Sequence, residues 1–222
     1  MSAVFVAGAH TDVGKTHVAC ALLTAARAAG RSVAALKPVV SGFDRADWAQ
    51  SDPGRLLAAC GRPLTDDALD AVSPWRFVAP LAPPMAARRE GRSLGLAEIA
   101  VWCRARLDGA DLTIVEGVGG LMSPIADDAT GLELMTALGL PVVLVGGSYL
   151  GAISHTLTAL ETARGRGLAV CAVVISQSSG SDVPDLAETI ADVRRHSGWV
   201  PVIGAPRDAE AGGWSATLLA GL

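Results

Sequence analysis

A loop bracketed by glycines lies between a predicted strand and a predicted helix near the start of the chain. Ala3–Ala7 is a short apolar run typical of a buried strand, Gly8–Thr16 reads GAHTDVGKT, and His17–Ala29 carries apolar residues at helical spacing. Backbone N–H groups in such a loop, together with the positive end of the following helix, bind phosphate oxygens. The strict phosphate-loop pattern requires glycine at position 9, but here the glycine stands one residue earlier. The order of strand, loop and helix nevertheless predicts a phosphate site.

The rest of the chain alternates short apolar runs with helical patterns. Further strands are predicted at Ser32–Leu36, Leu112–Val115, Pro141–Val145, Leu168–Ile175 and Pro201–Ile203. Further helices are predicted at Arg55–Cys60, Leu96–Leu107, Gly131–Leu138, Ile153–Arg166 and Pro184–His196. Buried strands separated by helices predict an α/β fold of the P-loop NTPase type, a doubly wound, mostly parallel sheet with helices on both faces. Gly42–Pro53 and Ser73–Gly91 lack periodicity and are predicted to be long, functional surface loops.

Composition narrows the class of protein. Hydrophobic residues make up 50% of the 222 residues and charged residues 18%, which excludes a disordered chain. No linker or repeat interrupts the sequence, so a single domain over residues 1–222 is expected. The net charge of −4 predicts neither a nucleic-acid nor a membrane partner. The apolar start has no basic segment before it and indicates a strand instead of a signal peptide, and four scattered cysteines suit a cytoplasmic protein.

The only two lysines among 18 basic residues occupy informative positions. Lys15, within the loop, is predicted to reach the outer phosphates of a nucleotide. Lys37 opens the sequence KPVVSG at the carboxyl end of the second predicted strand, which is the edge where open α/β sheets bind ligands. An ammonium group there can stabilise charge on a transferred group. The alternative for Lys37 is a solvated lysine at the end of a strand.

Oxygen-bearing side chains near the same edge are candidate Mg²⁺ ligands. Thr16 ends the loop, Glu116 ends an apolar strand in the sequence EGVGG, and Asp52 follows Ser51 at the start of a helical pattern. Hard oxygen ligands of this kind suit Mg²⁺. Asp52 could instead be a helix N-cap. Asp12 places a carboxylate beside bound phosphate, which suits a metal, a cationic amine substrate or capping of the helix N-terminus.

Together these motifs resemble those of the dethiobiotin synthetase family. The family's loop typically reads GT-x-T-(D/E)-VGKT, and Lys37–Gly42, Ser51–Asp52 and Glu116–Gly120 also follow its pattern. Pro141–Val145 followed by Gly151–Thr156 resembles the family's later strand and helix start, so the similarity spans nearly the whole chain. The resemblance implies an ATP- and Mg²⁺-dependent ligase of biotin biosynthesis. Such enzymes join CO₂ to 7,8-diaminopelargonic acid as a carbamate, phosphorylate the carbamate with ATP, and close a ureido ring.

The resemblance also implies roles for individual residues. Lys15 and Lys37 would be catalytic, and Mg²⁺ would bind to Thr16, Asp52 and Glu116. The substrate-binding residues would be Thr11, Asp12, Lys37, Ser41, Gly151 and Ser154. The ATP-binding residues would be Asp12, Val13, Gly14, Lys15, Thr16, His17, Asp52, Glu116, Gly117, Val118, Gly119, Ser176, Gln177, Ala205, Pro206 and Arg207. Family members generally complete the distant end of the diamine site with a second subunit, so a homodimer is expected.

The chain departs from the family at two positions. Ser176-Gln177 stands where the family often has Asn-Asp after a strand, and that Asn commonly contacts the adenine edge. A serine hydroxyl is shorter than an Asn amide, which predicts a looser base preference unless Gln177 or the backbone of Ala205–Arg207 compensates. Ser154 replaces the Asn of the family's G-x-(I/L)-NHT, an expected contact to the distant carboxylate of the substrate.

Two other classes of protein fit the sequence less well. A nucleotide-driven switch of the partitioning or metal-delivery type has a KGGxGKT loop, with lysine where this chain has His10 and glycines at Thr11 and Asp12. Another amide-forming or ring-forming ligase, such as a cobyrinate amidating enzyme, is expected to carry a fused glutaminase domain. A chain of 222 residues has no room for one.

Overall fold

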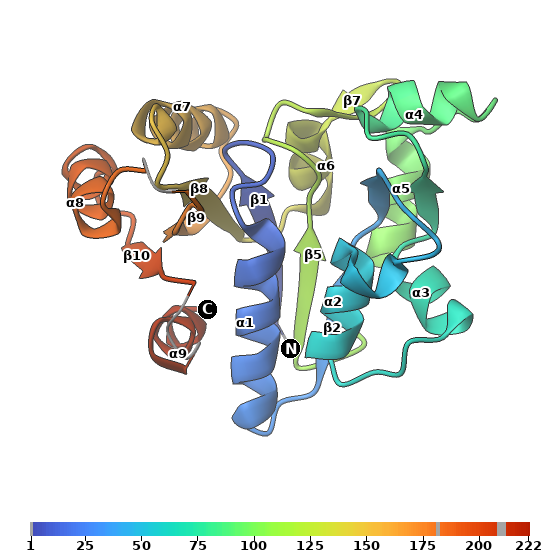
Figure 1. Cartoon of the computed structure of the whole chain (residues 1–222), viewed down its shortest axis with the longest axis horizontal. Helices are drawn as coiled ribbons and strands as arrows, with labels where there is room; N and C mark the ends of the chain where they lie inside the picture. The colour runs from blue at the N-terminus through green and yellow to red at the C-terminus, as the bar shows by residue number, and fades with distance from the viewer. Residues whose placement is uncertain (1, 181–182, 208–211) are drawn as a thin grey trace.

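The computed structural model describes residues 2–180, 183–207 and 212–222 (Figure 1). The strands are β1 Ser2–Gly8, β2 Val33–Leu36, β3 Val39–Ser41, β4 Trp75–Phe77, β5 Leu112–Glu116, β6 Pro124–Ala126, β7 Ala129–Thr130, β8 Val142–Gly147, β9 Val170–Ser176 and β10 Val202–Ala205. The helices are α1 Lys15–Ala28, α2 Asp52–Ala59, α3 Asp66–Val72, α4 Pro83–Arg89, α5 Leu96–Arg104, α6 Gly131–Leu138, α7 Ala152–Gly165, α8 Leu186–His196 and α9 Gly212–Ala220, with a 3₁₀ helix η1 Trp48–Gln50.

A six-stranded parallel sheet forms the centre of the fold, in the order β10-β9-β8-β1-β5-β2. From β1 the chain first crosses to β2 and β5 on one side, and it continues with β8, β9 and β10 on the other. The carboxyl end of β1 therefore lies where the direction of strand addition changes, which is where open α/β sheets bind ligands. The predicted doubly wound fold is confirmed.

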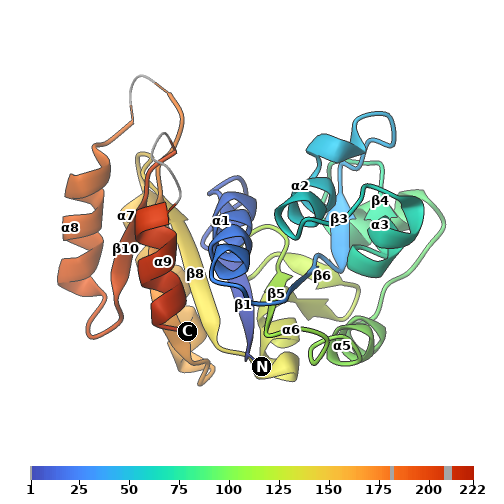
Figure 2. The same ribbon diagram turned by 90° about the horizontal axis from the view of Figure 1, so that it is seen from below.

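Helices cover both faces of this sheet. Helix α1 lies over one face between α9 and α2, and α5, α6, α7 and α8 cover the other face (Figures 1 and 2). Alternate side chains of β1 enter opposite cores: Val4 and Val6 pack under α1, while Phe5 and Ala7 pack toward the other helices. Each fully buried side chain of this size contributes about 1.5–3 kcal/mol, so the two cores hold the end of β1 firmly in place.

The segment Ser73–Gly91 corrects a prediction from the sequence. It was expected to be a long surface loop, but it contains β4, which pairs in parallel with β3, and the helix α4. Phe77 is 1% exposed, and Ala86 and Ala87 are fully buried. Its prolines Pro83 and Pro84 occupy the first turn of α4, where the missing N–H costs nothing, so they start a helix instead of preventing one.

Other elements lie near their predicted positions, with ends shifted by a few residues. The sequence did not indicate the helices α3 and α9 or the short β6–β7 hairpin. Gly42–Pro53 contains only η1 and the first two residues of α2. None of the helices in the described part of the chain is both long and apolar enough to cross a membrane.

Candidate active site

The phosphate loop joins β1 to α1 in a conformation that requires its glycines. A Cβ atom on Gly8 would come within 2.9 Å of the carbonyl oxygens of His10 and Gly119, which explains why the first glycine stands at position 8. Gly14 caps α1 with φ of 95°. Asp12 has φ of 57° and is the only described residue other than glycine with positive φ. This strained backbone supports a loop shaped around a ligand.

Lys15 lies at the start of α1 and turns back over the loop, where its Nζ donates a hydrogen bond to His10 O at 3.1 Å. Burial lowers the pKa of Lys15, and the nearby charge of Lys37 lowers it further, to about 8. The carboxylates Glu116, Asp52 and Asp12 act in the opposite direction. Lys15 is thus an ammonium group that no carboxylate in the described part of the chain contacts directly, and bound phosphate would stabilise its charge.

Four segments of the chain bring Thr16, Lys37, Asp52 and Glu116 into one network. Thr16 Oγ1 lies 2.7 Å from Asp52 Oδ1 and 2.7 Å from Glu116 Oε1. Lys37 Nζ lies 2.6 Å from Glu116 Oε1 and 2.9 Å from Asp52 Oδ2, and it donates to Gly117 O at 2.9 Å. Lys37 is 1% exposed. The alternative of a solvated lysine at the end of a strand is therefore wrong.

The network fixes the charge states of its members. Burial opposes ionisation of Asp52, but the charge and hydrogen bond of Lys37, with the bond from Thr16, lower the pKa of Asp52 to about 2. Burial alone would lower the pKa of Lys37, yet Glu116 and Asp52 raise it above its usual value. Burial raises the pKa of Glu116 despite the neighbouring ammonium group. Asp52 and Lys37 thus form an ion pair at neutral pH.

Asp52 is not the helix cap that the sequence allowed. Ser51 caps α2, since its Oγ accepts a hydrogen bond from Gly54 N at 3.4 Å. Asp52 is the first residue of α2, and its side chain turns instead toward Thr16 and Lys37. Its side chain is 39% exposed, so it can face both the network and a ligand.

These residues fit a divalent cation. A hydroxyl group has one proton, so only one of the two short contacts of Thr16 to carboxylate oxygens can be a hydrogen bond at a time. Glu116 Oε2 is buried without a hydrogen-bond partner among the described residues. Close, unprotonated oxygens of this kind are the ligands that Mg²⁺ prefers, and Mg²⁺ commonly uses one or two carboxylates together with substrate phosphates.

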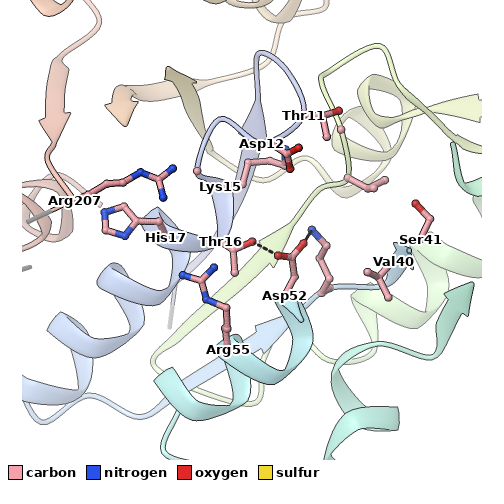
Figure 3. Close-up of a pocket in the computed structure, with 14 residues that line it drawn as sticks. Thr11, Asp12, Lys15, Thr16, His17, Val40, Ser41, Asp52, Arg55 and Arg207 are labelled. Atoms are coloured by element: carbon pink, nitrogen blue, oxygen red, sulfur yellow. Dashed lines mark hydrogen bonds and ion pairs between the residues drawn. The ribbon is translucent and has the colours of Figure 1, made fainter. Parts of the chain in front are cut away.

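A cavity of about 350 Å³ opens beside the loop and the network (Figure 3). Twelve residues that the sequence analysis assigned to the site line this cavity: Thr11, Asp12, Gly14, Lys15, Thr16, His17, Lys37, Ser41, Asp52, Val118, Gly119 and Arg207. Val40 and Arg55 also line it, and the sequence analysis assigned them no role. Arg55 follows Asp52 by three residues in α2, and this helical spacing could have placed both side chains on one face.

Other predicted residues support the cavity from behind. Val13 is buried in the core next to α1, and Glu116 and Gly117 lie behind Lys37. Ser176 is 1% exposed, and its Oγ would lie 2.3 Å from a Cβ on Gly14, so it packs against the loop. The side chain of Ala205 is fully buried.

Gln177 links the two segments expected to contact the base. Its backbone N donates to Ala205 O at 3.0 Å, and its Oε1 accepts from Arg207 N at 3.1 Å. Arg207 Nε in turn donates to Gln177 O at 2.7 Å. The side-chain amide nitrogen of Gln177 remains as the group with which it could contact a ligand. The backbone of Pro206, which precedes Arg207, faces the side chain of His17.

Gly151 and Ser154 do not line this cavity; both are exposed at the start of α7. A second, shallower groove of about 490 Å³ lies nearby, between the loop, α7 and the segment Gly120–Pro124. His10 of the loop and His155 of α7 stack there with ring centroids 5.6 Å apart. The phosphate loop therefore separates the cavity from the groove.

The fold and this loop define the class of protein. Solved structures with the same fold include the hydrogenase maturation factor HypB from Archaeoglobus fulgidus (TM-score 0.55, 15% identity, covering 98% of this chain and 88% of that one). Another is the cell division ATPase MinD from Pyrococcus furiosus (TM-score 0.57, 15% identity, covering 100% of this chain and 98% of that one). At this identity the likeness concerns the fold alone, which is that of the P-loop NTPases.

Sequence comparison gives the family. A family model described as an AAA domain matches residues 2–208. The ATP-dependent dethiobiotin synthetase BioD of Phenylobacterium zucineum (strain HLK1) is 58% identical over 98% of this chain and 94% of its own length. The protein of the same name from Caulobacter vibrioides (strain NA1000 / CB15N) is 54% identical over 100% of this chain and 99% of its own length. The chain belongs to the dethiobiotin synthetase family, and the predicted resemblance is confirmed.

Proposed function

We propose that the chain is the ATP-dependent ligase that converts 7,8-diaminopelargonic acid and CO₂ into dethiobiotin, with release of ADP and phosphate, in biotin biosynthesis. Relatives named as ATP-dependent dethiobiotin synthetases, 58% and 54% identical over nearly the whole chain, support this activity. The observation that carries the proposal is the network of Lys37 with Glu116 and Asp52 beside Lys15, because it directs two ammonium groups at one cavity.

The first step joins one substrate amine to CO₂. The neutral amine nitrogen attacks the carbon, a C–N bond forms, one C=O electron pair moves onto oxygen, and the amine loses a proton to solvent. The product is a carbamate anion. Asp12 lines the cavity and would hold the second amine as an ammonium group, while Lys15 and Lys37 would stabilise the charge on the carbamate.

The next steps activate the carbamate and close the ring. A carbamate oxygen attacks the γ-phosphorus of ATP, and the P–O bond to ADP breaks with its electron pair on ADP. The second amine, once it has lost its ammonium proton, attacks the carbonyl carbon, phosphate leaves with the electron pair of the C–O bond, and the new ring nitrogen loses a proton to solvent. Lys15, at the outer phosphates, and Lys37, buried in a fixed position, would stabilise the negative charge that develops in both steps.

Magnesium would bind to Thr16, Asp52 and Glu116. When bound there, Mg²⁺ would neutralise charge on the phosphate oxygens. The low pKa of Asp52, about 2, supports this role because the carboxylate stays ionised at any physiological pH. Lys37 pairs with the same two carboxylates, so the network would keep its total charge low before the cation and nucleotide arrive.

The base of the nucleotide would lie near Gln177 and Arg207, beyond Ser176. Ser176 is packed against Gly14, which favours the looser base preference expected from the loss of the family's Asn. The amide nitrogen of Gln177 is the candidate for a remaining base contact, since its oxygen is occupied by Arg207 N.

A second copy of the chain would complete the substrate site in a homodimer. Leu150 and Met122, near the groove beside the loop, are 90% and 55% exposed, and apolar side chains of this size favour burial in an interface. Gly151 and Ser154 lie on the same side, where they could contact substrate bound in a neighbouring subunit. The four cysteines are free, which suits the cytoplasm.

The test is direct detection of product. The purified protein is incubated with Mg²⁺-ATP, bicarbonate and 7,8-diaminopelargonic acid, and dethiobiotin is measured by mass spectrometry. We expect dethiobiotin to accumulate only when all components are present. Failure to form it at any protein concentration, by a chain that is folded and binds nucleotide, would refute the proposed activity.

A further inference from the structure

Two arginines from different elements enter one end of the cavity. Arg55 comes from α2 and Arg207 follows β10, and both guanidinium groups face the space beside His17 and Thr16 (Figure 3). This arginine end, Arg55, Arg207 and His17, lies on the far side of Thr16 from Val40 and Ser41. Neither the ring-closing chemistry nor the metal site uses these side chains.

The two guanidinium groups still have free hydrogen-bond donors. Within residues 2–180, 183–207 and 212–222, no side chain or carbonyl accepts a hydrogen bond from the Arg55 guanidinium. Arg207 is oriented by Gln177, which uses its Nε and backbone N, and its two terminal nitrogens have no partner in the same ranges. Guanidinium groups directed into an enclosed space bind ligands with several anionic oxygens, such as phosphates.

Within the described residues, the charge at this end of the cavity is also uncompensated. Lys37 is paired with Asp52 and Glu116, whereas Arg55 and Arg207 face no carboxylate among the described residues. An anion is therefore favoured beside these two guanidinium groups.

We propose that Arg55 and Arg207 clamp the α-phosphate of the bound nucleotide and strengthen its binding irrespective of the base. This inference rests on the proposed function for the direction in which ATP lies. The loop backbone and Lys15 would hold the outer phosphates, and Gln177 marks the base side. The phosphate next to the nucleoside then lies beside Thr16 and His17, between the two guanidinium groups.

The clamp would offset the weak contact to the base. A charge-assisted hydrogen bond to phosphate typically changes affinity about tenfold or more. Because this clamp would contact phosphate oxygens only, its removal should weaken the binding of every nucleoside phosphate by the same factor. A nucleoside that lacks phosphate should bind to the variant as it does to the wild type.

The experiment measures binding without turnover. Arg55→Ala is titrated with adenosine, AMP, ADP and GDP in competition with a fluorescent ADP analogue, in the presence of Mg²⁺. We expect Kd to rise about tenfold for AMP, ADP and GDP alike and to stay unchanged for adenosine. Arg89→Ala removes an exposed arginine of α4 outside the cavity, and it should change none of the four values. Arg55→Gln, of similar side-chain length, should behave as Arg55→Ala and provides the measurement if the alanine variant is unstable.

Two results would overturn the clamp. Equal weakening of adenosine and AMP would place Arg55 on the sugar or base, and unchanged binding of all four ligands would leave it without a role in nucleotide binding. Neither result bears on dethiobiotin formation. Conversely, a chain that binds ADP through Arg55 but forms no dethiobiotin would refute the proposed function and leave the clamp standing.

Discussion

The two ends of the cavity hold their charged groups in opposite ways. At the lysine end, contacts of 2.6–2.9 Å join Lys37 and Thr16 to the carboxylates of Asp52 and Glu116, and Lys15 lies beside this network. At the arginine end, the guanidinium groups of Arg55 and Arg207 face the cavity without a carboxylate among the described residues. Preorganised charge suits a chemical step, because little reorganisation is needed as the reaction proceeds. Unpaired charge suits binding of an incoming anion.

The largest effect should follow from Lys37→Ala. Loss of one electrostatic group from the reacting end typically costs about 10²–10³ in kcat, or roughly 3–4 kcal/mol. The same change leaves the buried carboxylate of Glu116 without its partner, which should lower the free energy of unfolding by about 3–5 kcal/mol. Steady-state kinetics and urea denaturation of the variant measure the two effects. A variant with near-normal kcat would show that the lysine end is not where the reaction occurs.

Glu116→Gln tests the metal site at the same end. The amide keeps the shape of the side chain but removes one charge from the ligand set, so the Mg²⁺ concentration needed for half-maximal activity should rise about ten- to hundredfold. EDTA should abolish activity in both proteins, and Mg²⁺ or Mn²⁺ should restore it. Activity of the wild-type protein that survives complete removal of metal would contradict the assignment.

The pKa of Lys15 predicts that nucleotide binding depends on pH through this single group of the lysine end. Since this pKa is about 8, against 10.5 for an ordinary lysine, the group loses its charge as pH rises above 8. Affinity for ADP should then fall by up to about tenfold per pH unit. In the unfolded chain Lys15 stays protonated up to about pH 10.5, so the free energy of unfolding should rise with pH between about 8 and 10.5. Lys15→Arg, which stays charged, should remove the pH dependence of ADP binding. If ADP affinity of this variant still falls with pH as in the wild type, another group causes the pH dependence.

Base preference should show the smallest effect. Each lost hydrogen bond to the base is worth about 1 kcal/mol, so kcat/KM for ATP should exceed that for GTP or CTP only several-fold per remaining contact. Gln177→Ala should reduce this ratio further without changing kcat. Gln177→Glu is the matched variant, because it keeps the size of the side chain but lacks the amide nitrogen. A preference for ATP above a thousandfold would mean that another group contacts the base.

The sequence predicted the lysine end better than the arginine end for a physical reason. Most residues of the lysine end lie at the end of the loop or at the carboxyl ends of strands, which the parallel sheet brings to one edge. The arginine end is assembled by tertiary contacts: Arg207 is oriented by Gln177, and Arg55 enters from a helix whose start depends on the cap at Ser51. Local pattern does not encode such contacts.

The same reasoning explains the errors in the fold. Ser73–Gly91 seemed irregular because prolines usually break periodic patterns, but Pro83 and Pro84 begin α4. Similarly, the burial of Lys37 depends on Glu116, a residue of another strand, and no property of the sequence around Lys37 reveals it. The core strands were predicted correctly because both of their faces are apolar.

The most direct test of the account is whether ATP is consumed only as the ring forms. The protein is supplied with Mg²⁺-ATP and ¹³C-bicarbonate, with and without 7,8-diaminopelargonic acid, and ADP, phosphate and labelled dethiobiotin are quantified together. We predict equal amounts of all three, with the label in dethiobiotin and negligible ADP when the diamine is omitted. Steady ATP hydrolysis that is independent of the diamine, as a nucleotide-driven switch would show, would contradict the account.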